Sequence, residues 1–413
     1  MNCRHCGSEL HLPFLDLGNA PPSNAYLTEE AVRAPEIWFP LRILVCESCW
    51  LVQTEDHAGR EALFTQDYAY FSSFSTTWLA HAKRYVGQMI ERFGLNASSC
   101  VVEVAANDGY LLQYVKQAGL SCYGIEPTTS TASAARSKGI DIVERFFGVE
   151  LAEELVQAGR QADLMVANNV LAHVPDINDF VLGFTRLLKP QGVVTFEFPH
   201  LLRMVQENQF DTAYHEHYSY LSLTAVQRIF SANGLTVFDV EELPTHGGSL
   251  RVFAQRSESG AHEHSLAVAS QLEMEAKAGM TTPAFYQAFQ HRAEKLKDDL
   301  VLFLIDAKRR GLKVGAYGAA AKGNTLLNFA GTRPDLLPYV VDKNPSKQGK
   351  CMPGSRIPIV DEAYLKADRP DLILILPWNL REEVMAQLAY VQEWGGKFVT
   401  AVPELNVSKA KTA

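Results

Sequence analysis

The middle of the chain alternates short apolar runs with segments of helical spacing. Val101–Val104 is an apolar run interrupted by one acid, Glu103, as in a buried parallel strand. Apolar positions at helical intervals follow from Leu111 to Ala118, and a second apolar run from Ser121 ends on Glu126. Further strands are predicted at about 142–143, 163–169, 192–198, 236–243 and 249–255, with helices at about 77–93, 179–188 and 223–233. This order predicts an α/β fold whose sheet closes with a strand hairpin.

The turn at residues 105–109 is the first candidate binding site. Backbone N–H groups at such a turn face a ligand, and an acid at the end of the next strand, here Glu126, takes ribose hydroxyls. A dinucleotide site requires Gly-x-Gly-x-x-Gly, but Ala105 and Asn107 occupy the first two glycine places and only Gly109 remains. With Glu103 before the turn, the pattern favours a cofactor that has a positive centre and no phosphate, namely S-adenosylmethionine. The alternative is an ordinary β-α-β unit without a ligand.

Polar residues gather where the carboxyl ends of the predicted strands should meet, which is where α/β sheets bind ligands. Asn168 and Asn169 end one strand, and His173 follows them. A long connection after the next strand carries Tyr214-His215-Glu216-His217-Tyr218, and long loops on a compact sheet are usually functional.

The five residues 214–218 allow three interpretations. A metal site is possible in principle, but no His-x-x-x-His or cysteine partners accompany the two histidines. A hydrogen-bonded surface loop is the second. The third is general acid–base catalysis, in which an imidazole accepts a proton, an adjacent carboxylate orients it, and a phenol donates to a developing oxyanion. Methyl transfer to carbon needs such a base, because a proton next to a carbonyl must be removed.

Four cysteines near the N-terminus form two Cys-x-x-Cys pairs, which consist of Cys3, Cys6, Cys46 and Cys49. Two such knuckles can close four thiolates on one tetrahedral zinc, and the residues between them would form a small insert. A redox-active pair is the alternative. Because all four ligand places would be filled by sulfur, we expect a structural metal.

The last third of the chain predicts a second α/β unit. A long helix is expected over about 283–310, and Lys313–Thr325 then reads as another strand, turn and helix. Gly318 offers bare backbone at this turn and Lys322 a counter-charge, as in a phosphate-binding turn. NAD is the competing ligand, although the glycine spacing does not match the dinucleotide fingerprint.

Composition limits the class of protein. The chain has 413 residues, a net charge of -9 and 47% hydrophobic residues, which describes a globular protein of two or three domains and argues against general nucleic-acid binding. The sequence contains no apolar run of about 18 residues, so it predicts no membrane span. The N-terminus also lacks the apolar core of a signal peptide. We therefore expect a cytoplasmic protein with no membrane or nucleic-acid partner.

Six motifs in order resemble the S-adenosylmethionine-dependent C-methyltransferases of nucleotide-linked deoxysugars. They are Cys-x-x-Cys…Cys-x-x-Cys, Asp-Tyr-x-Tyr-Phe-Ser-Ser-Phe-Ser, Val-Glu-Val-Ala-Ala-Asn-Asp-Gly, Ala-His-Val-Pro-Asp, Tyr-His-Glu-His-Tyr-Ser-Tyr and His-Gly-Gly-Ser-Leu-Arg. The resemblance covers nearly the whole chain. It implies a zinc-binding module (1–66), a class I methyltransferase Rossmann-like domain (67–256) and a second Rossmann-like α/β domain that holds the nucleotide-sugar (257–413).

The resemblance also implies residue roles on a dTDP-linked ketosugar, commonly methylated at C3. His217 would be the general base and Glu216 would orient or assist it, while Tyr214, His173 and Tyr68 would hold the sugar. Glu126 would bind the cofactor ribose. The full cofactor set is Glu103, Ala105, Asn107, Gly109, Glu126, Asn168 and Asn169. Candidates for the diphosphate side are His246, Ser249, Arg251, Lys322, Asn324 and Arg356.

Two other classes of function stay open from the sequence. One is a zinc-containing methyltransferase that acts on RNA or protein, which the acidic balance disfavours. The other is a sugar-nucleotide binding protein without catalysis. We expect a monomer.

Overall fold

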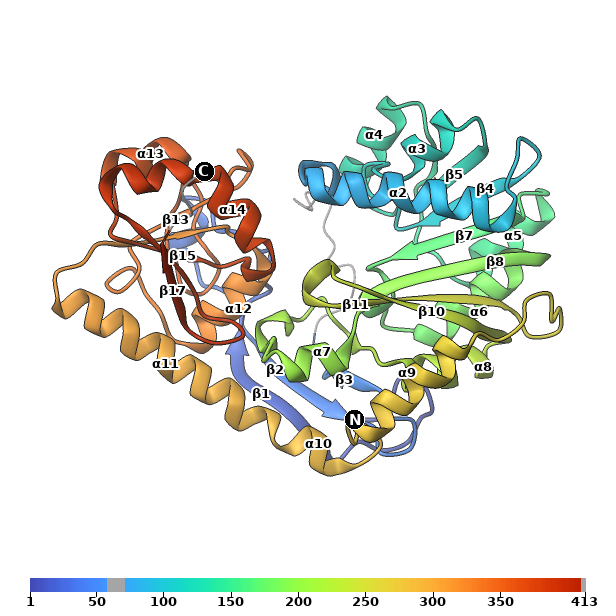
Figure 1. Cartoon of the computed structure of the whole chain (residues 1–413), viewed down its shortest axis with the longest axis horizontal. Helices are drawn as coiled ribbons and strands as arrows, with labels where there is room; N and C mark the ends of the chain where they lie inside the picture. Colours follow the sequence, from blue (N-terminus) through green and yellow to red (C-terminus); the bar gives the residue numbers. More distant parts are fainter. Residues whose placement is uncertain (58–70, 410–413) are drawn as a thin grey trace.

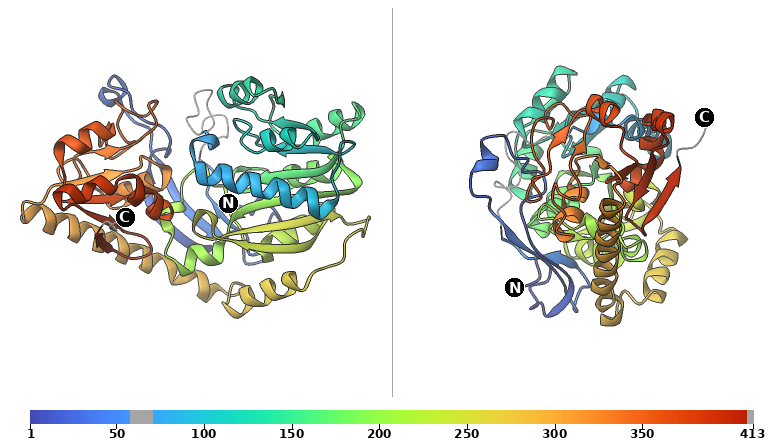
Figure 2. Two further views of the ribbon diagram at one scale, coloured as in Figure 1. Left: turned by 45° about the horizontal axis from the view of Figure 1, so that its top comes forward. Right: turned by 90° about the vertical axis from the view of Figure 1, so that its left-hand side faces the viewer.

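Three β-sheets organise the computed structural model, which describes residues 1–57 and 71–409. In Figure 1 the C-terminal sheet and its helices lie at the left, the middle sheet lies at the right, and the strands of the N-terminal sheet run below and between them. The two views of Figure 2 show the same arrangement. No helix within the described ranges is both long and apolar enough to cross a membrane.

The middle sheet has seven strands in the order β10-β11-β8-β7-β4-β5-β6. The five strands from β4 to β8 are parallel to one another, and β11 runs antiparallel to both of its neighbours, as predicted. The strands are β4 (Cys100–Val104), β5 (Ser121–Ile125), β6 (Asp141–Val143), β7 (Ala162–Asn168), β8 (Leu188–Pro199), β10 (Leu235–Leu243) and β11 (Ser249–Arg256).

Helices cover both faces of the middle sheet. Val101 packs in the core under α2, α3 and α4, whereas its neighbour Val102 packs in the core under α5, α6 and α8. Both faces are therefore buried, which explains the continuous apolar runs of the parallel strands. The helices are α2 (Thr76–Phe93), α3 (Leu112–Gln117), α4 (Thr129–Ser137), α5 (Val149–Gln157), α6 (Ile177–Leu187) and α8 (Leu223–Ala232).

The N-terminal sheet is antiparallel, with the order β1-β2-β3-β9. The insert between the cysteine pairs folds as the hairpin of β1 (Leu12–Ala20) and β2 (Phe39–Val45), with a 3-10 turn, η1 (Ala31–Arg33), in its connection. β3 (Val52–Thr54) then pairs with β9 (Ser219–Tyr220), which belongs to the long connection after β8. The segment that carries His217 therefore leads directly into a strand of the N-terminal sheet.

The C-terminal sheet has six strands in the order β14-β13-β12-β15-β16-β17. They are β12 (Val314–Tyr317), β13 (Val340–Val341), β14 (Ile359–Val360), β15 (Leu372–Ile375), β16 (Lys397–Thr400) and β17 (Asn406–Lys409). The helices of this unit are α12 (Ala321–Phe329), α13 (Glu362–Asp368) and α14 (Arg381–Gln387). This confirms the predicted second α/β unit and adds β14 and β17 at its edges.

The helix predicted over 283–310 is in fact two helices, α10 (Pro283–Gln287) and α11 (Phe289–Arg309), which meet at Ala288. The Phe289 ring stacks on Phe14 of β1, with ring centroids 4.8 Å apart, and one hydrophobic core joins the N-terminal sheet, α11 and the C-terminal sheet. The remaining elements are α7 (Leu201–Gln206), α9 (Leu266–Lys277) and the 3-10 turns η2 (Ser72–Phe74), η3 (Leu171–His173), η4 (Phe210–Thr212), η5 (Thr245–Gly247), η6 (Trp378–Leu380) and η7 (Ala389–Trp394).

Candidate active site

The turn after β4 forms as predicted. Ala105 and Asn107 adopt positive φ angles of 60° and 48°, and Gly109 has a φ of 73°. Only glycine fits at position 109, because a Cβ there would lie 2.3 Å from Cδ1 of Ile140. The turn therefore packs tightly against the helix that follows β5.

Glu126 is buried at the end of β5 and ties the turn together. Its carboxylate accepts the N–H of Asn107 at 2.9 Å and the N–H of Thr128 at 3.0 Å. Burial raises the pKa of this carboxyl, while those hydrogen bonds oppose the shift. Glu126 is therefore fixed beside the turn at the carboxyl end of β5.

Buried acceptors without partners surround the same turn. Both carboxylate oxygens of Glu103 and the side-chain oxygen of Asn168 have no hydrogen-bond partner of good geometry among the described residues. Burial raises the pKa of Glu103 well above its usual range, with the Tyr110 hydroxyl beside it opposing the shift. Orphaned buried acceptors are costly unless a ligand supplies donors. A cofactor that bears an ammonium and a sulfonium, such as S-adenosylmethionine, fits this set.

The structure brings His173 and His217 together. Their ring centroids are 4.7 Å apart, and the Tyr214 ring lies 3.9 Å from that of His217. Nδ1 of His173 donates to the carbonyl of Glu216, and Nδ1 of His217 donates to the carbonyl of Thr212, both at 2.8 Å. Because a carbonyl only accepts, both rings carry a proton on Nδ1, and Nε2 of His217 keeps its lone pair.

Burial keeps both rings neutral. It lowers the pKa of His173 to about 4, and it lowers the pKa of His217 well below its usual value with a further contribution from the neighbouring His173. His217 is therefore poised to accept a proton throughout the neutral range.

Glu216 does not orient the His217 ring in this structure. Its Oε1 accepts from Nδ2 of Asn24 at 3.1 Å, its Oε2 has no partner within the described ranges, and burial raises its pKa. The orienting contact comes from the Thr212 carbonyl, since η4 lies directly against the loop that carries His217. Tyr68 lies outside the described residues.

Lys322, near the start of α12, faces the same place from the C-terminal unit. Its ammonium lies 4.5 Å from the ring centre of Trp378 and 3.1 Å from Oδ1 of Asn379. Burial lowers its pKa to about 8, and the charge of Asp211 opposes that shift. Trp378 in turn donates its Nε1–H to Asp211 at 2.8 Å. The cation that the sequence assigned to a phosphate-binding turn is thus bonded to Asn379 and packed on Trp378, with the charge of Asp211 nearby.

His246 is the hairpin residue that reaches this region. It adopts a φ of 55°, its Nε2 accepts from Nδ2 of Asn169 at 3.3 Å, and its ring packs edge-on to Trp78 at 5.2 Å. Burial lowers its pKa to about 4, and the nearby Lys322 charge lowers it further. Asn169, expected at the cofactor, therefore also contacts the hairpin.

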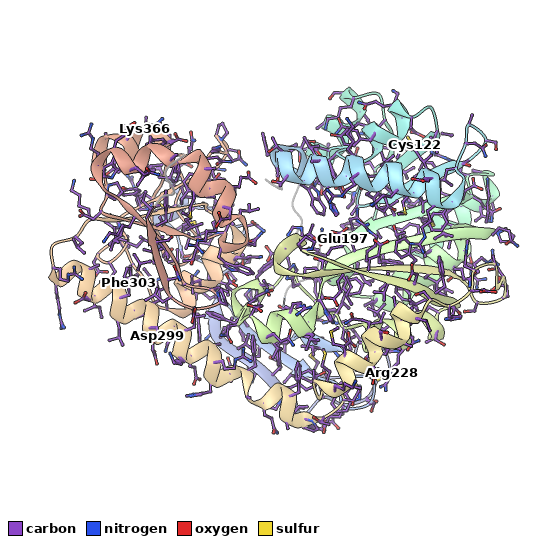
Figure 3. All side chains as sticks on the ribbon, viewed as in Figure 1. Cys122, Glu197, Arg228, Asp299, Phe303 and Lys366 are labelled. Carbon is purple, nitrogen blue, oxygen red and sulfur yellow. The ribbon has the colours of Figure 1, made fainter. Side chains whose placement is uncertain are left out.

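Other residues assigned to the diphosphate are engaged within the protein. Ser249 donates to the Thr245 carbonyl at 2.9 Å. Arg251 is buried in β11 and pairs with Glu197 at 2.9 Å and Glu241 at 3.1 Å. Glu197, labelled in Figure 3, lies on the side of the middle sheet that faces the C-terminal sheet. The two acids neutralise Arg251, because strand pairing places it directly opposite Glu197.

Arg356 and Asn324 are also engaged within the protein. The guanidinium of Arg356 donates to the carbonyl of Val32 at 2.9 Å, on the exposed connection between β1 and β2. Asn324 is 1% exposed, and its side-chain oxygen accepts from Asn328 one helical turn later at 3.1 Å. Its Nδ2 has no partner among the described residues.

Sequence reasoning missed four residues of this region, namely Trp78, Asp211, Thr212 and Trp378. Trp378 alone carried a usable signal, since it follows the carboxyl end of β15, where polar and aromatic residues gather. Thr212 acts through its backbone carbonyl, which no residue type reveals.

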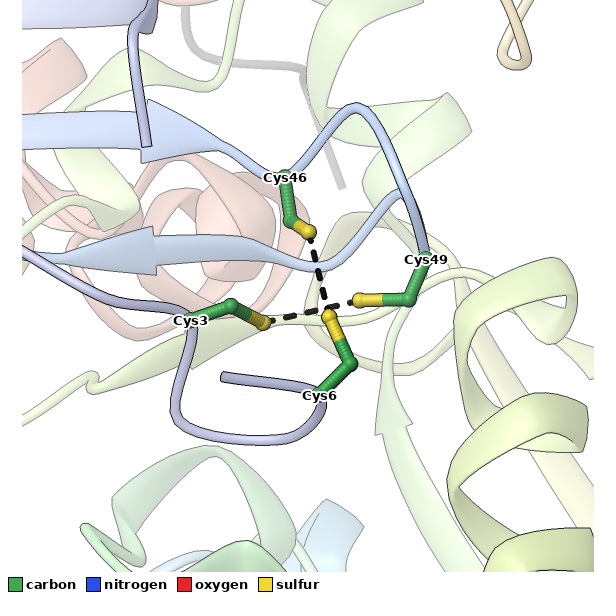
Figure 4. A group of neighbouring side chains, drawn as sticks. All are labelled: Cys3, Cys6, Cys46 and Cys49. Atoms are coloured by element: carbon green, nitrogen blue, oxygen red, sulfur yellow. Dashed lines mark hydrogen bonds between the residues drawn. The ribbon is translucent and has the colours of Figure 1, made fainter. Parts of the chain in front are cut away.

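The four N-terminal cysteines converge as predicted (Figure 4). All four sulfurs lie within 4.8 Å of one another. The closest approaches, Cys3 to Cys49 and Cys6 to Cys46 at 3.5 Å, cross between the two knuckles rather than joining the cysteines of one Cys-x-x-Cys. That arrangement fits a tetrahedral zinc site with four thiolate ligands better than a redox pair.

Three family models match the chain. They are a zinc binding domain over residues 3–64, a methyltransferase domain over 78–240 and a C-methyltransferase C-terminal domain over 244–403. The C-methyltransferase NovU of Streptomyces niveus is 33% identical over 410 residues, which cover 99% of this chain and 97% of that relative.

Two methyltransferases are among the solved structures to which the chain has a weak similarity. The 1,6-didemethyltoxoflavin-N1-methyltransferase of Burkholderia thailandensis has a TM-score of 0.37 and 15% identity, and covers 50% of this chain and 96% of its own. The magnesium protoporphyrin IX methyltransferase of Synechocystis PCC 6803 has a TM-score of 0.36 and 15% identity, with coverage of 49% and 100%.

The sheet order, the cofactor turn and the methyltransferase match define the class, which is that of S-adenosylmethionine-dependent methyltransferases. Similarity to NovU over almost the whole length narrows the assignment from methyltransferases in general to C-methyltransferases. The chain belongs to the C-methyltransferase family, and its N-terminal module carries the four-cysteine cluster of a zinc site.

Proposed function

We propose that this enzyme methylates a carbon of a nucleotide-linked ketosugar, with a dTDP-ketosugar methylated at C3 as the first candidate. The observation that carries the proposal is the neutral His217 ring, whose Nδ1–H is fixed on Thr212, whose Nε2 keeps its lone pair, and which lies near enough to Lys322 for that charge to lower its pKa. Methylation of oxygen or nitrogen needs only modest help from a base, whereas methylation of carbon requires removal of a C–H proton.

His217 performs the first chemical step of the proposed reaction. Its Nε2 takes the proton from the carbon next to the ketone, and the Thr212 carbonyl stabilises the resulting imidazolium through Nδ1–H. Tyr214 and His173 pack around the ring and hold the enolate oxygen and the neighbouring hydroxyl. When bound, S-adenosylmethionine supplies an electrophilic methyl group on sulfur to the carbon that has lost its proton.

The C-terminal unit holds the nucleotide in this proposal. Lys322 offers the positive charge that a diphosphate requires, and the first turn of α12, which no side chain caps, offers backbone N–H groups. The functional units are proposed to be 1–66 for zinc, 67–256 for the cofactor and 257–413 for the nucleotide-sugar, within a monomer.

Exchange of substrate hydrogen tests the proton step apart from methyl transfer. The enzyme is incubated in D2O with a dTDP-ketosugar and S-adenosylhomocysteine, and deuterium uptake at the carbon next to the ketone is followed by NMR. Wild type exchanges that hydrogen, and His217→Ala loses exchange and turnover by about 10²- to 10⁴-fold, the usual contribution of a general base.

His215→Gln is the matched control. His215 lies two residues away in the same motif, but its Nε2 bonds the Pro40 carbonyl and its ring packs on Phe39. This variant should exchange at the wild-type rate. Exchange that survives in His217→Ala, with folding intact by circular dichroism, contradicts the proposal.

A further inference from the structure

Arg4 links the metal knuckle to both histidine loops. Its side chain is 5% exposed. Nη1 donates to the carbonyl of Pro175 at 3.0 Å, and Nη2 donates to the carbonyl of Thr54 and to Oδ1 of Asp56, both at 2.9 Å. The guanidinium also lies over the ring of Tyr218, 5.2 Å from its centre. One buried cation therefore touches three separate segments of the chain.

Two of these contacts lie within two residues of an active-site histidine along the chain. The others lie at the end of β3 or within two residues of it, and β3 bonds the loop of His217. Pro175 follows His173 by two residues, and Tyr218 follows His217 directly. Thr54 bonds the loop of His217 twice, since its Oγ1 donates to the His217 carbonyl at 2.7 Å and its N–H donates to the Tyr218 carbonyl at 3.1 Å. The position of the guanidinium thus bears on both imidazoles.

The metal site fixes the backbone from which Arg4 projects. Arg4 lies between Cys3 and Cys6, and its N–H donates to Oε1 of Gln53 at 2.9 Å. Nε2 of the same Gln53 donates to the sulfur of Cys3 at 3.3 Å. Such contacts to a ligand sulfur orient the ligand and are sensitive to whether the metal is bound.

We propose that Arg4 is a positioning residue through which the closed four-cysteine cluster sets the placement of His173 and His217. The inference rests on the proposed role of those histidines in removing the substrate proton. A planar guanidinium can hold two carbonyls and a carboxylate at once, whereas the point charge of lysine cannot span them. The zinc module is then part of the catalytic apparatus as well as a source of stability.

Arg4→Lys tests this against Arg42→Lys in the same module. Arg42 pairs with Glu55 on the surface, its Nε 2.9 Å from a carboxylate oxygen, and contacts neither histidine loop. Zinc content, S-adenosylmethionine affinity, kcat, KM and deuterium exchange without S-adenosylmethionine are measured for both. Arg4→Lys should keep about one zinc and wild-type cofactor affinity, yet lose about tenfold or more in exchange and kcat, with little change in KM.

Thr54→Val provides a second probe that leaves Arg4 and the cysteines in place, and it carries the test if Arg4→Lys does not fold. It removes only the hydroxyl that donates to the His217 carbonyl, and it should slow exchange in the same way. Exchange and kcat within about twofold of wild type in every folded variant of this pair overturn the inference. Exchange that survives in His217→Ala overturns the proposed function instead, so the two failures are distinct.

Discussion

Two turns in this protein share one backbone device and differ in charge. After β4, the acid at the end of the next strand, Glu126, accepts the N–H of Asn107 and that of Thr128. After β12, Asp342 accepts the N–H of Ala319 and that of Asn344, each at 2.8 Å. In both units the acid accepts one hydrogen bond from the turn and one from the residue two positions after the acid itself.

The surrounding side chains separate the two turns. The first is flanked by Glu103 and Asn168, which are buried acceptors. The second is flanked by Lys322 and by Lys347, whose ammonium donates to the Ala319 carbonyl at 2.8 Å. We propose that the same loop geometry serves a cationic ligand at the first turn and an anionic ligand at the second, and that the flanking side chains decide which.

The largest effect in a test of this difference between the two turns is expected from removing the charge of Lys322. Lys322→Met should weaken nucleotide-sugar binding by about 10- to 100-fold, since a charged hydrogen bond contributes roughly 1.5–3 kcal/mol, and leave S-adenosylmethionine affinity unchanged. Wild-type affinity should fall as pH rises through about 8, where the ammonium loses its proton, and Lys322→Arg should remove that fall. Calorimetric titration measures both. An equal loss of affinity for the nucleotide-sugar and for S-adenosylmethionine would contradict the assignment of the two turns to different ligands.

The turn glycines offer a matched pair of variants. Gly109 and Gly318 have φ angles of 73° and 91°, and a Cβ would lie 2.3 Å from Ile140 and 2.4 Å from Pro377 respectively. Each alanine variant should lose about 1–3 kcal/mol of stability. Gly109→Ala should weaken only the cofactor and Gly318→Ala only the nucleotide-sugar, as followed by denaturation and titration. Cross-effects of similar size would show that the turns are not separate sites.

Glu103→Gln sharpens the comparison from the cofactor side. The variant should bind S-adenosylmethionine about tenfold more weakly, which corresponds to about 1.4 kcal/mol, because a positive ligand favours the ionised form of the acid, which glutamine cannot adopt. Its free energy of unfolding should rise relative to wild type as pH increases. The pKa of Glu103 is raised in the folded state, so stability from the bound proton is lost above the usual pKa, and glutamine has no proton to lose. Unchanged cofactor affinity would rule out contact with the positive centre.

The smallest expected effect is a pH dependence from His246, which lies between the two turns. Its folded pKa of about 4 lies below the unfolded value, so its contribution to stability is full above about pH 6.5 and is lost as pH falls toward 4. Between pH 7.5 and 5.5 wild type should lose about 1 kcal/mol more than His246→Gln in urea denaturation. Identical losses of stability in wild type and His246→Gln would show that the His246 ring is in contact with water rather than buried.

Periodicity predicted the parallel strands, because both faces of that sheet are buried and the apolar runs are unbroken. The two Cys-x-x-Cys pairs likewise predicted the metal cluster, and the hairpin of β1 and β2 brings the two pairs together. Arg251 was assigned to a diphosphate, and the sequence does not show that β11 lies beside β8 and brings Glu197 to it. Asp211 and the Thr212 carbonyl were missed for the same reason, as only the fold places η4 between the loop of His217 and α12.

The pairing of β3 with β9 has a consequence for recombination among relatives. The histidine loop leads into a strand that joins two units of the fold, so residues 1–57 and 214–220 form one exchangeable block although they are distant in sequence. A chimera that takes its N-terminal module from one relative and its cofactor domain from another joins mismatched halves of a β-ladder. Grafts that transfer both segments together should retain turnover where single-segment grafts do not.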